Sequence, residues 1–319
     1  MTFEHADVRT SSKPWGSHDL RPWSRCGNTE TPIGELRFDR PETQTPDPAL
    51  LFKLLFTKQR LSIQVHPQDA FAHSMGMANG KTEAWYVLSA EDSAQVAIGL
   101  KRTLTRPELR GAIADGSIAD LVKWQTVAAG DVFFIPAGTI HAIGPGLVMA
   151  EIQQRSDTTF RLFDYGRSRE LHIDQAVAVV DLGPAKPDKI PTYLTVERMK
   201  LVSCDFFVLE RIDLPPNANW ELQAQRETWA LVTAGDATMG SLRAGVGDAF
   251  FAEADRAVIN VGPSGLTVLL AYADSAPQPG LLRDLDDRKP DFAIRDSPQV
   301  GISSRKPASV SLRSTEGHL

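Results

Sequence analysis

The frequent turn residues of this chain constrain its fold more than any other feature. Glycine and proline account for 23 and 21 of the 319 residues, and they divide the apolar residues into short runs. Short apolar runs between turn residues are typical of β-strands, and many such strands predict a mainly β sandwich or barrel. The expected strands are AWYVLS (84–89), AQVAIGL (94–100), DVFFIP (131–136), HAIGPGLVMAEIQ (141–153), FFVLERIDL (206–214), WALVTAG (229–235), DAFFAEA (248–254), AVINVG (257–262) and LTVLLAYA (266–273).

Helical patterns are few. The segment 105–124 begins with Thr105, a residue that caps helices well, and has Pro107 in its first turn. The segment 172–182 is a second, shorter candidate, with its best start at Asp174. We therefore expect a β protein with a few short helices.

Composition indicates where the chain divides. Three prolines and a glycine gather in 181–192, which indicates a linker between a first domain over 1–185 and a second over 186–287. From Arg288 onward the sequence is rich in Ser, Arg, Lys and Pro and poor in apolar residues. We expect 288–319 to be a disordered or loosely docked tail.

Charge and hydropathy argue against several classes of protein. The net charge of −6 is unlike that of a general nucleic-acid binder. Apolar runs of membrane-spanning length are lacking, and the first residues lack the apolar core of a secretory signal. Cys26 and Cys204 are far apart and form no CxxC motif, so free thiols are expected rather than a disulfide framework. These features predict a cytoplasmic protein.

Two pairs of segments resemble one another across the chain. TEAWYVLSA (82–90) matches RETWALVTA (226–234), and GDVFFIPAGTIHAI (130–143) matches GDAFFAEADRAVIN (247–260) in the same order. The position of His141 is occupied by Val258 in the second copy. We therefore expect two related β units, of which only the first binds a metal, and a structural role for the second.

Four polar residues of the first unit are good metal ligands. Ser62, Gln64 and His66 alternate with apolar residues in LSIQVHPQDA (61–70), so on a strand they share one face. Two imidazoles, a carboxylate and an amide oxygen suit a divalent ion such as zinc, iron or manganese. A single histidine is more often hydrogen-bonded inside a β core, but the set as a whole predicts a metal site. The four are Gln64, His66, Glu83 and His141.

The remaining histidines lie in polar or loop-like contexts, where surface positions are commoner. They are His5, His18, His73, His172 and His318.

The spacing of Gly130, Pro136, Gly138 and His141 matches the second motif of the cupin superfamily. More broadly, the first 180 residues resemble the short bacterial form of the type I mannose-6-phosphate isomerases. The matching segments run in family order: KPWGS (13–17), IGE (33–35), LLFKLLFTKQRLSIQVHPQD (50–69), GKTEAWYVL (80–88), GDVFFIPAGTIHAIG (130–144) and EIQQRSDTTFRLFDYGR (151–167).

The resemblance implies a double cupin, two jelly-roll barrels, that interconverts D-mannose 6-phosphate and D-fructose 6-phosphate through an enediol-like intermediate. It assigns the metal, expected to be one zinc ion per chain, to the four ligands named above. It implies catalytic roles for Arg161, Glu151 and Lys81. Residues expected to bind the substrate and its phosphate are Ser62, Lys53, Lys81 and Arg161.

Some residues depart from the family pattern, and some are compatible with simpler roles. Arg37 stands where the family usually has tryptophan, and no firm motif matches beyond residue 185. By itself Glu151 fits a strand-end ion pair, and Arg161 fits a solvated strand face. The metal ligands also fit a cupin dioxygenase, and the fold fits a non-catalytic module that binds sugar phosphates. The metal used in the cell, the oligomeric state and the strictness for mannose 6-phosphate stay open.

Overall fold

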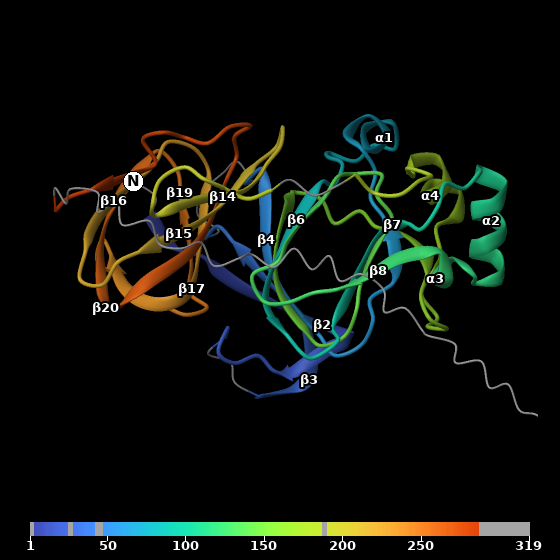
Figure 1. Cartoon of the computed structure of the whole chain (residues 1–319), viewed down its shortest axis with the longest axis horizontal. Helices are drawn as coiled ribbons and strands as arrows, with labels where there is room; N and C mark the ends of the chain where they lie inside the picture. Colours follow the sequence, from blue (N-terminus) through green and yellow to red (C-terminus); the bar gives the residue numbers. More distant parts are fainter. Residues whose placement is uncertain (1–2, 25–27, 42–46, 187–189, 287–319) are drawn as a thin grey trace, which may run out of the picture. The chain divides into compact units, whose positions relative to one another are not determined.

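The computed structural model describes residues 3–24, 28–41, 47–186 and 190–286. The tail expected at 288–319, together with Cys26 and His318, lies outside the described residues. The prediction of a mainly β fold is confirmed, with the strands arranged in three sheets. Figure 1 shows this arrangement.

Two sheets form the barrel of the first half. In the six-stranded sheet the order is β2 (Asp7–Asp19), β3 (Asn28–Asp39), β4 (Leu50–Thr57), β11 (Leu147–Gln154), β6 (Glu83–Ala90) and β9 (Val132–Ile135). In the five-stranded sheet it is β12 (Phe160–Phe163), β5 (Ile63–Val65), β10 (His141–Ile143), β7 (Gln95–Leu100) and β8 (Val122–Thr126). Apolar residues of both sheets, among them Trp85, Met149, Ile98 and Ile143, fill the space between them.

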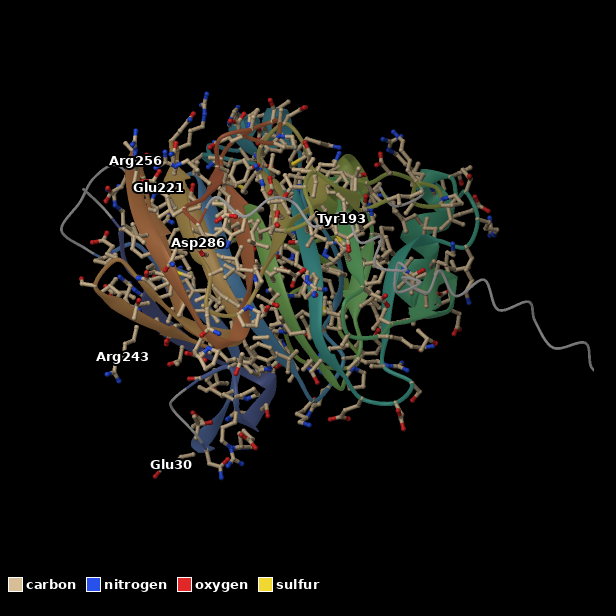
Figure 2. The ribbon with its side chains drawn as sticks, turned by 60° about the vertical axis from the view of Figure 1, so that its left-hand side comes forward. Glu30, Tyr193, Glu221, Arg243, Arg256 and Asp286 are labelled. Atoms are coloured by element: carbon tan, nitrogen blue, oxygen red, sulfur yellow. The ribbon has the colours of Figure 1, made fainter. Side chains whose placement is uncertain are left out.

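The second half forms one ten-stranded sheet, which also contains the first strand of the chain. Its members are β1 (Phe3–His5), β13 (Thr192–Tyr193), β14 (Arg198–Ser203), β15 (Val208–Leu214), β16 (Asn219–Ala224), β17 (Thr228–Met239), β18 (Leu242–Gly245), β19 (Ala249–Ala252), β20 (Asp255–Tyr272) and β21 (Leu282–Asp284). One face surrounds its own apolar core, and the other packs on the outer face of the six-stranded sheet. Figure 2 shows Arg243 and Arg256 on the outside of these strands.

Four short helices belong to the first half: α1 (Asp69–Ser74), α2 (Arg106–Asp115), α3 (Ile118–Leu121) and α4 (Ile173–Val179). α2 begins as predicted, because Thr105 and Glu108 form a reciprocal capping box. It ends at Gly116, whose left-handed backbone separates α2 from α3. α2, α3 and α4 cover the outer face of the five-stranded sheet, as Figure 1 shows beside β7 and β8.

The two segment matches differ in how well they coincide in space. Phe133 and its sequence counterpart Phe250 both point into the core of their own half. Trp85 lies opposite Phe133, whereas the residue opposite Phe250 is Ala230 rather than Trp229. A shift of one residue turns a side chain to the other face of a sheet. Trp229 accordingly packs in the layer between the halves, while Trp85 lies inside the first barrel.

Candidate metal centre and its pocket

Three of the predicted ligands converge at the centre of the first barrel. His66 follows β5 directly, and Glu83 and His141 are the first residues of β6 and β10. The Nε2 atoms of His66 and His141 lie 3.4 and 3.5 Å from the two oxygens of Glu83. The ligand atoms of all three residues lie within 4.8 Å of one another, and all three side chains are buried. No other group of this kind is found in the part of the chain that the structure describes.

The outward nitrogen of each imidazole is held by a backbone carbonyl. His66 Nδ1 lies 2.9 Å from the Thr158 oxygen, and His141 Nδ1 lies 2.9 Å from the Thr139 oxygen. A carbonyl only accepts hydrogen bonds, so both Nδ1 atoms carry the proton and both Nε2 lone pairs face Glu83. This second layer of contacts is typical of metal-ligating histidines. Gly138, at a φ of 94°, donates its N–H to the His66 oxygen at 2.8 Å. This bond joins the turn before His141 to the segment that carries His66.

Electrostatics keep the cluster in the form that binds cations. Burial and the nearby Lys81 ammonium lower the pKa of His66 to about 3, and burial lowers the pKa of His141. Burial alone would raise the pKa of Glu83, but Lys81 and His66 outweigh it and hold that pKa well below its usual range. The cluster is thus two neutral imidazoles around a carboxylate. Glu83 Oε2 is buried and contacts the Lys81 ammonium at 2.8 Å. Two neutral imidazoles whose Nε2 atoms face a carboxylate are a donor set that fits a divalent cation.

Gln64 completes the predicted set. It lies opposite His141 across the β5–β10 pair, with its Nε2 3.1 Å from His141 Nε2. Its Oε1 accepts a hydrogen bond from the Ser62 hydroxyl at 3.1 Å. Rotating the amide by half a turn would present the oxygen to the cluster, and the hydroxyl would then accept from the amide nitrogen. Ser62, Gln64 and His66, predicted to share one face of a strand, are thus connected: His66 belongs to the cluster, Gln64 contacts His141, and Ser62 bonds to Gln64.

Lys81 links the cluster to a second carboxylate. Its Nζ lies 2.8 Å from Glu83 Oε2 and 3.2 Å from His66 Nε2. Burial would lower the pKa of Lys81, but Glu151 and Glu83 outweigh it and raise that pKa, so the ammonium stays charged. Burial raises the pKa of Glu151 to about 7, with Lys81 opposing and Glu83 reinforcing the shift. A carboxyl with such a pKa is suited to donate and accept protons near neutral pH.

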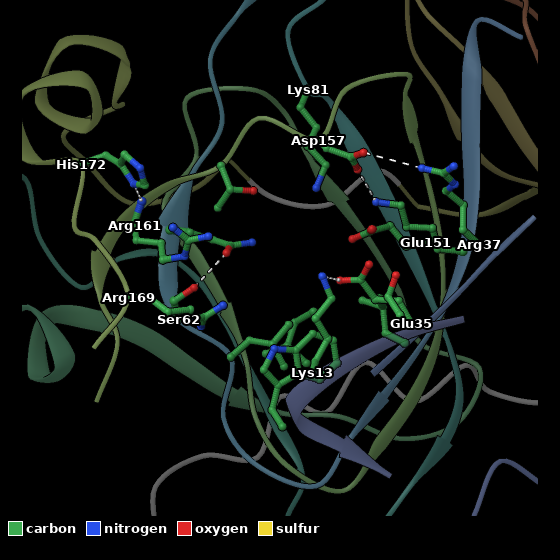
Figure 3. Close-up of a pocket in the computed structure, with 18 residues that line it drawn as sticks. Lys13, Glu35, Arg37, Ser62, Lys81, Glu151, Asp157, Arg161, Arg169 and His172 are labelled. Atoms are coloured by element: carbon green, nitrogen blue, oxygen red, sulfur yellow. Dashed lines mark hydrogen bonds and ion pairs between the residues drawn. The ribbon is translucent and has the colours of Figure 1, made fainter. Parts of the chain in front are cut away.

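A pocket of about 430 Å³ opens beside the cluster, and Gln64 and Lys81, which contact the two histidines of the cluster, line this pocket. All the residues predicted to contact substrate line this pocket: Ser62, Lys53, Lys81, Glu151 and Arg161. Its wall contains six basic and three acidic side chains, which favours an anionic ligand. Figure 3 shows Arg161, Arg169 and Ser62 on one side and Glu151, Arg37 and Asp157 on the other.

Two of the predicted phosphate donors, Lys53 and Arg161, differ in how far they are already paired. Lys53 donates to Asp157 Oδ1 at 2.9 Å. Among the described residues, no carboxylate forms an ion pair with Arg161 within 4.0 Å. Burial and the neighbouring Arg169 lower the pKa of Arg161, as expected where two cations share a wall. Arg161 is thus better placed than Lys53 to bind an incoming anion.

Sequence reasoning missed several pocket residues. His172, expected at the surface, is half-buried and lines the pocket, where its Nδ1 accepts the Arg161 backbone N–H at 3.2 Å. Arg37 lines the pocket too, pairs with Asp39 at 3.0 Å and lies 3.8 Å from Asp157. Asp157 stands four residues before Arg161, the one signal that it would reach the same wall. The other missed residues include Lys13, Trp15 and Arg169.

The fold and the site together define a class: a double cupin with a buried His/Glu/His cluster beneath a cationic pocket. Comparisons with known proteins show what this chain is similar to in sequence and in fold. The chain is 41% identical over 170 residues to "Mannose-6-phosphate isomerase" of Streptococcus mutans serotype c, covering 50% of this chain and 53% of that protein. It is 37% identical over 189 residues to "Mannose-6-phosphate isomerase ManA" of Bacillus subtilis, covering 54% and 58%. The chain thus matches about half the length of these curated relatives.

Solved structures share the fold over most of the chain. The crystal structure of the mannose 6-phosphate isomerase from Bacillus subtilis has a TM-score of 0.73 at 23% identity, covering 85% of this chain and all of that one. The apo form of the Salmonella typhimurium mannose 6-phosphate isomerase has a TM-score of 0.68 at 16% identity, covering 86% and 100%. No protein-family model matches the chain. In the described residues, no helix combines the length and apolar character needed to cross a membrane.

Proposed function

We propose that this chain is a metal-dependent isomerase that interconverts D-mannose 6-phosphate and D-fructose 6-phosphate. The observation that carries the proposal is the position of Glu151, a buried carboxyl with a pKa of about 7 in the wall of a cationic pocket, beside a metal-type cluster. Aldose–ketose isomerisation needs such a proton carrier and an electrophile for the sugar oxygens. The similarity to proteins named mannose-6-phosphate isomerase supports this choice of reaction.

The metal would be held by His66, Glu83 and His141, with Gln64 as a fourth ligand after rotation of its amide. When bound, a divalent cation, which we propose to be zinc, supplies a positive charge that polarises the carbonyl and hydroxyl oxygens of the sugar. One such ion per chain is proposed, with the catalytic role in the half up to residue 185 and a structural role for 186–287.

The residues of the chain account for the proton transfers. Glu151 removes the proton from C2 of the aldose and returns it to C1, while a proton moves from O2 to O1, so no atom is gained or lost. Lys81 stays charged beside Glu151 and Glu83, and it stabilises negative charge that develops on the sugar oxygens. Arg161, which forms no ion pair within 4.0 Å with a carboxylate of the described residues, binds the phosphate together with Ser62. The pairing of Lys53 with Asp157 makes it the weaker phosphate donor.

A coupled assay separates this function from its two rivals. Protein stripped of metal is refilled with zinc, manganese, cobalt or iron and given mannose 6-phosphate, while fructose 6-phosphate and oxygen uptake are both followed. We expect fructose 6-phosphate to form only with metal and without loss of oxygen. Oxygen uptake would support a dioxygenase, and sugar-phosphate binding without turnover in folded, refilled protein would support a binding module. Either result would overturn the isomerase proposal.

A further inference from the structure

The indole N–H of Trp85 lies between the carboxylates of Glu83 and Glu151. Trp85 Nε1 is 3.1 Å from Glu83 Oε1 and 3.2 Å from Glu151 Oε1. The side chain is fully buried, and its ring meets the His141 ring edge-on at 5.5 Å. One N–H is therefore shared between a proposed metal ligand and the proposed proton carrier.

Strand pairing produces this arrangement. Glu83 and Trp85 are two residues apart on β6, so their side chains lie on the same face. Glu151 on β11 lies directly opposite Trp85 in the β6–β11 register. Side chains opposite one another across two strands are within direct reach. The indole is consequently held where both carboxylates meet, by the central strands of the six-stranded sheet.

We propose that Trp85 is a positioning residue that fixes the rotamers of Glu83 and Glu151 together. The part that concerns Glu151 rests on the proposed function; the part that concerns Glu83 rests only on the metal cluster. Trp85 does not line the pocket, and it acts through the two carboxylates. Hydrogen bonds to charged groups in the low-dielectric interior of a protein are stronger than at the surface. Groups that orient metal ligands commonly change metal affinity 10- to 100-fold when removed.

The second half of the chain contains a comparison for this residue. Trp229 follows Glu227 by the same two positions, and its Nε1 donates to Glu227 Oε1 at 2.9 Å. Within the described residues this indole has Glu227 as its one carboxylate acceptor, and Glu227 is bound in turn by backbone N–H groups of Ala49 and Leu50. Replacing Trp229 by Phe thus removes the same local hydrogen bond and the same ring volume outside the pocket.

The test compares Trp85→Phe with the matched control Trp229→Phe. Zinc affinity of each protein is measured by competition with a chromophoric chelator. We expect Trp85→Phe to weaken zinc binding about 10- to 100-fold, with Trp229→Phe within about threefold of the unchanged protein. Equal zinc affinity in the two variants would overturn the role toward Glu83. This readout does not depend on the isomerase activity, so it stands even if the proposed reaction is wrong.

The role toward Glu151 is tested by kinetics. We expect Trp85→Phe, saturated with zinc, to lower kcat at least tenfold with little change in KM. In a Glu151→Gln background the same substitution should lower kcat no further, because coupled residues are not additive. Additive losses would overturn the role toward Glu151. If Trp85→Phe fails to fold, β-(3-benzothienyl)alanine is placed at position 85, which keeps the ring shape and replaces the N–H by sulfur. The same losses of zinc affinity and kcat are expected for it, and their absence would overturn the proposal.

Discussion

At the scale of single residues, the site shifts the pKa values of two glutamates in opposite directions within one barrel. Glu83 is surrounded by Lys81 and two imidazoles, and its pKa is held well below the usual range despite burial. Glu151 is buried and close to the charge of Glu83, which raises its pKa to about 7. Groups of one type whose pKa values are pushed apart commonly divide the work of an active site. One carboxylate is suited to bind a cation, and the other to move a proton.

Replacing Glu151 by glutamine tests the proton carrier. General acid–base catalysis commonly contributes 10²- to 10⁴-fold, so we expect kcat to fall by about that factor with zinc affinity retained. A carboxyl must be ionised to accept a proton, so its contribution as a base is lost below its pKa. The unchanged enzyme should therefore gain kcat as the pH rises through about 7. Full activity of Glu151→Gln, or a rate that is flat from pH 5 to 9, would contradict the assignment.

The raised pKa of Glu151 also predicts how stability varies with pH in metal-stripped protein. The folded-state pKa of Glu151 lies above its usual value, so folding favours the protonated carboxyl. The contribution of Glu151 to the free energy of unfolding is therefore complete below its unfolded-state pKa and is lost as the pH rises through about 7. Glu151→Gln should therefore melt above the unchanged protein at pH 8 and close to it at pH 4.5. Thermal denaturation at the two pH values checks this, and a difference of opposite sign at pH 8 would refute it.

Lys81 competes with a cation for the same ligands, since its ammonium contacts Glu83 and His66. Lys81→Met should bind zinc about tenfold more tightly, because a charge repulsion is removed, while isomerase activity falls at least 100-fold. Lys53→Met is the control, since that ammonium pairs with Asp157 instead. Competition with a chelator measures both affinities. A lower zinc affinity in Lys81→Met would mean that the lysine supports the metal site.

The convergence of the four proposed ligands could be predicted because motif and ligand chemistry pointed to the same residues. Gln64, His66, Glu83 and His141 were all identified from the sequence, and the structure brings them together. Trp85 lies in an expected strand and is buried, but the sequence does not indicate that its N–H bonds two carboxylates. The contact with Glu151 crosses two strands that are 66 residues apart in sequence. Such a contact depends on strand register, which the sequence does not reveal.

At the scale of elements, β12 and the start of α4 are joined at the pocket wall through Arg161 and His172. His172, at the N-cap of α4, donates its backbone N–H to the Arg161 oxygen at 2.9 Å and accepts the Arg161 N–H through Nδ1. Burial and Arg161 lower the pKa of His172, which keeps Nδ1 free to accept. The helix start thus fixes the backbone that carries Arg161.

Removing this acceptor should impair substrate binding. His172→Leu leaves the Arg161 N–H without its partner, at a cost of about 1–3 kcal/mol, and we expect kcat/KM to fall about tenfold or more. Asn at position 172 can present its oxygen where Nδ1 lies, so His172→Asn should keep kcat/KM within about threefold. Steady-state kinetics on both variants decide the question. Equal losses in the two would show that the acceptor is irrelevant.

Elements were predicted best where their signals are local. The capping residue Thr105 located the start of α2. The segment expected as one strand at 141–153 forms two, β10 and β11, with Gly-Pro-Gly at 144–146 between them. The segments expected as two strands at 257–262 and 266–273 form the single strand β20, with Gly265 at a φ of 79° between them. The face on which Trp229 lies was not predictable, because it depends on what the second half packs against.

At the scale of the whole described structure, the halves share one apolar layer and one buried carboxylate. The layer joins Phe52, Leu54 and Tyr86 of the first half to Trp229 and Phe251 of the second. Glu227, from the second half, accepts the backbone N–H groups of Ala49 and Leu50 just before and at the start of β4. β4 carries Lys53, so the second half supports one wall of the pocket.

Breaking this link should destabilise both halves together. Glu227→Gln places an amide N–H₂ group where a carboxylate oxygen now accepts, leaving a buried backbone N–H unpaired at about 1–3 kcal/mol. We expect urea unfolding to stay a single transition with a lower midpoint, with fluorescence and zinc release reporting the same curve. Separate transitions would show that the halves fold independently and that the layer between them is weak.

One metal ion at the His66, Glu83 and His141 cluster should enable the isomerisation, and a titration tests this dependence directly. Metal-stripped protein receives zinc in steps, and bound zinc and conversion of mannose 6-phosphate to fructose 6-phosphate are measured on the same samples. We expect a rate that rises in proportion to bound zinc and stops at one ion per chain, with no zinc-dependent rate in His141→Ala. Turnover in metal-stripped protein, or undiminished turnover in His141→Ala, would contradict a metal-dependent reaction at this cluster.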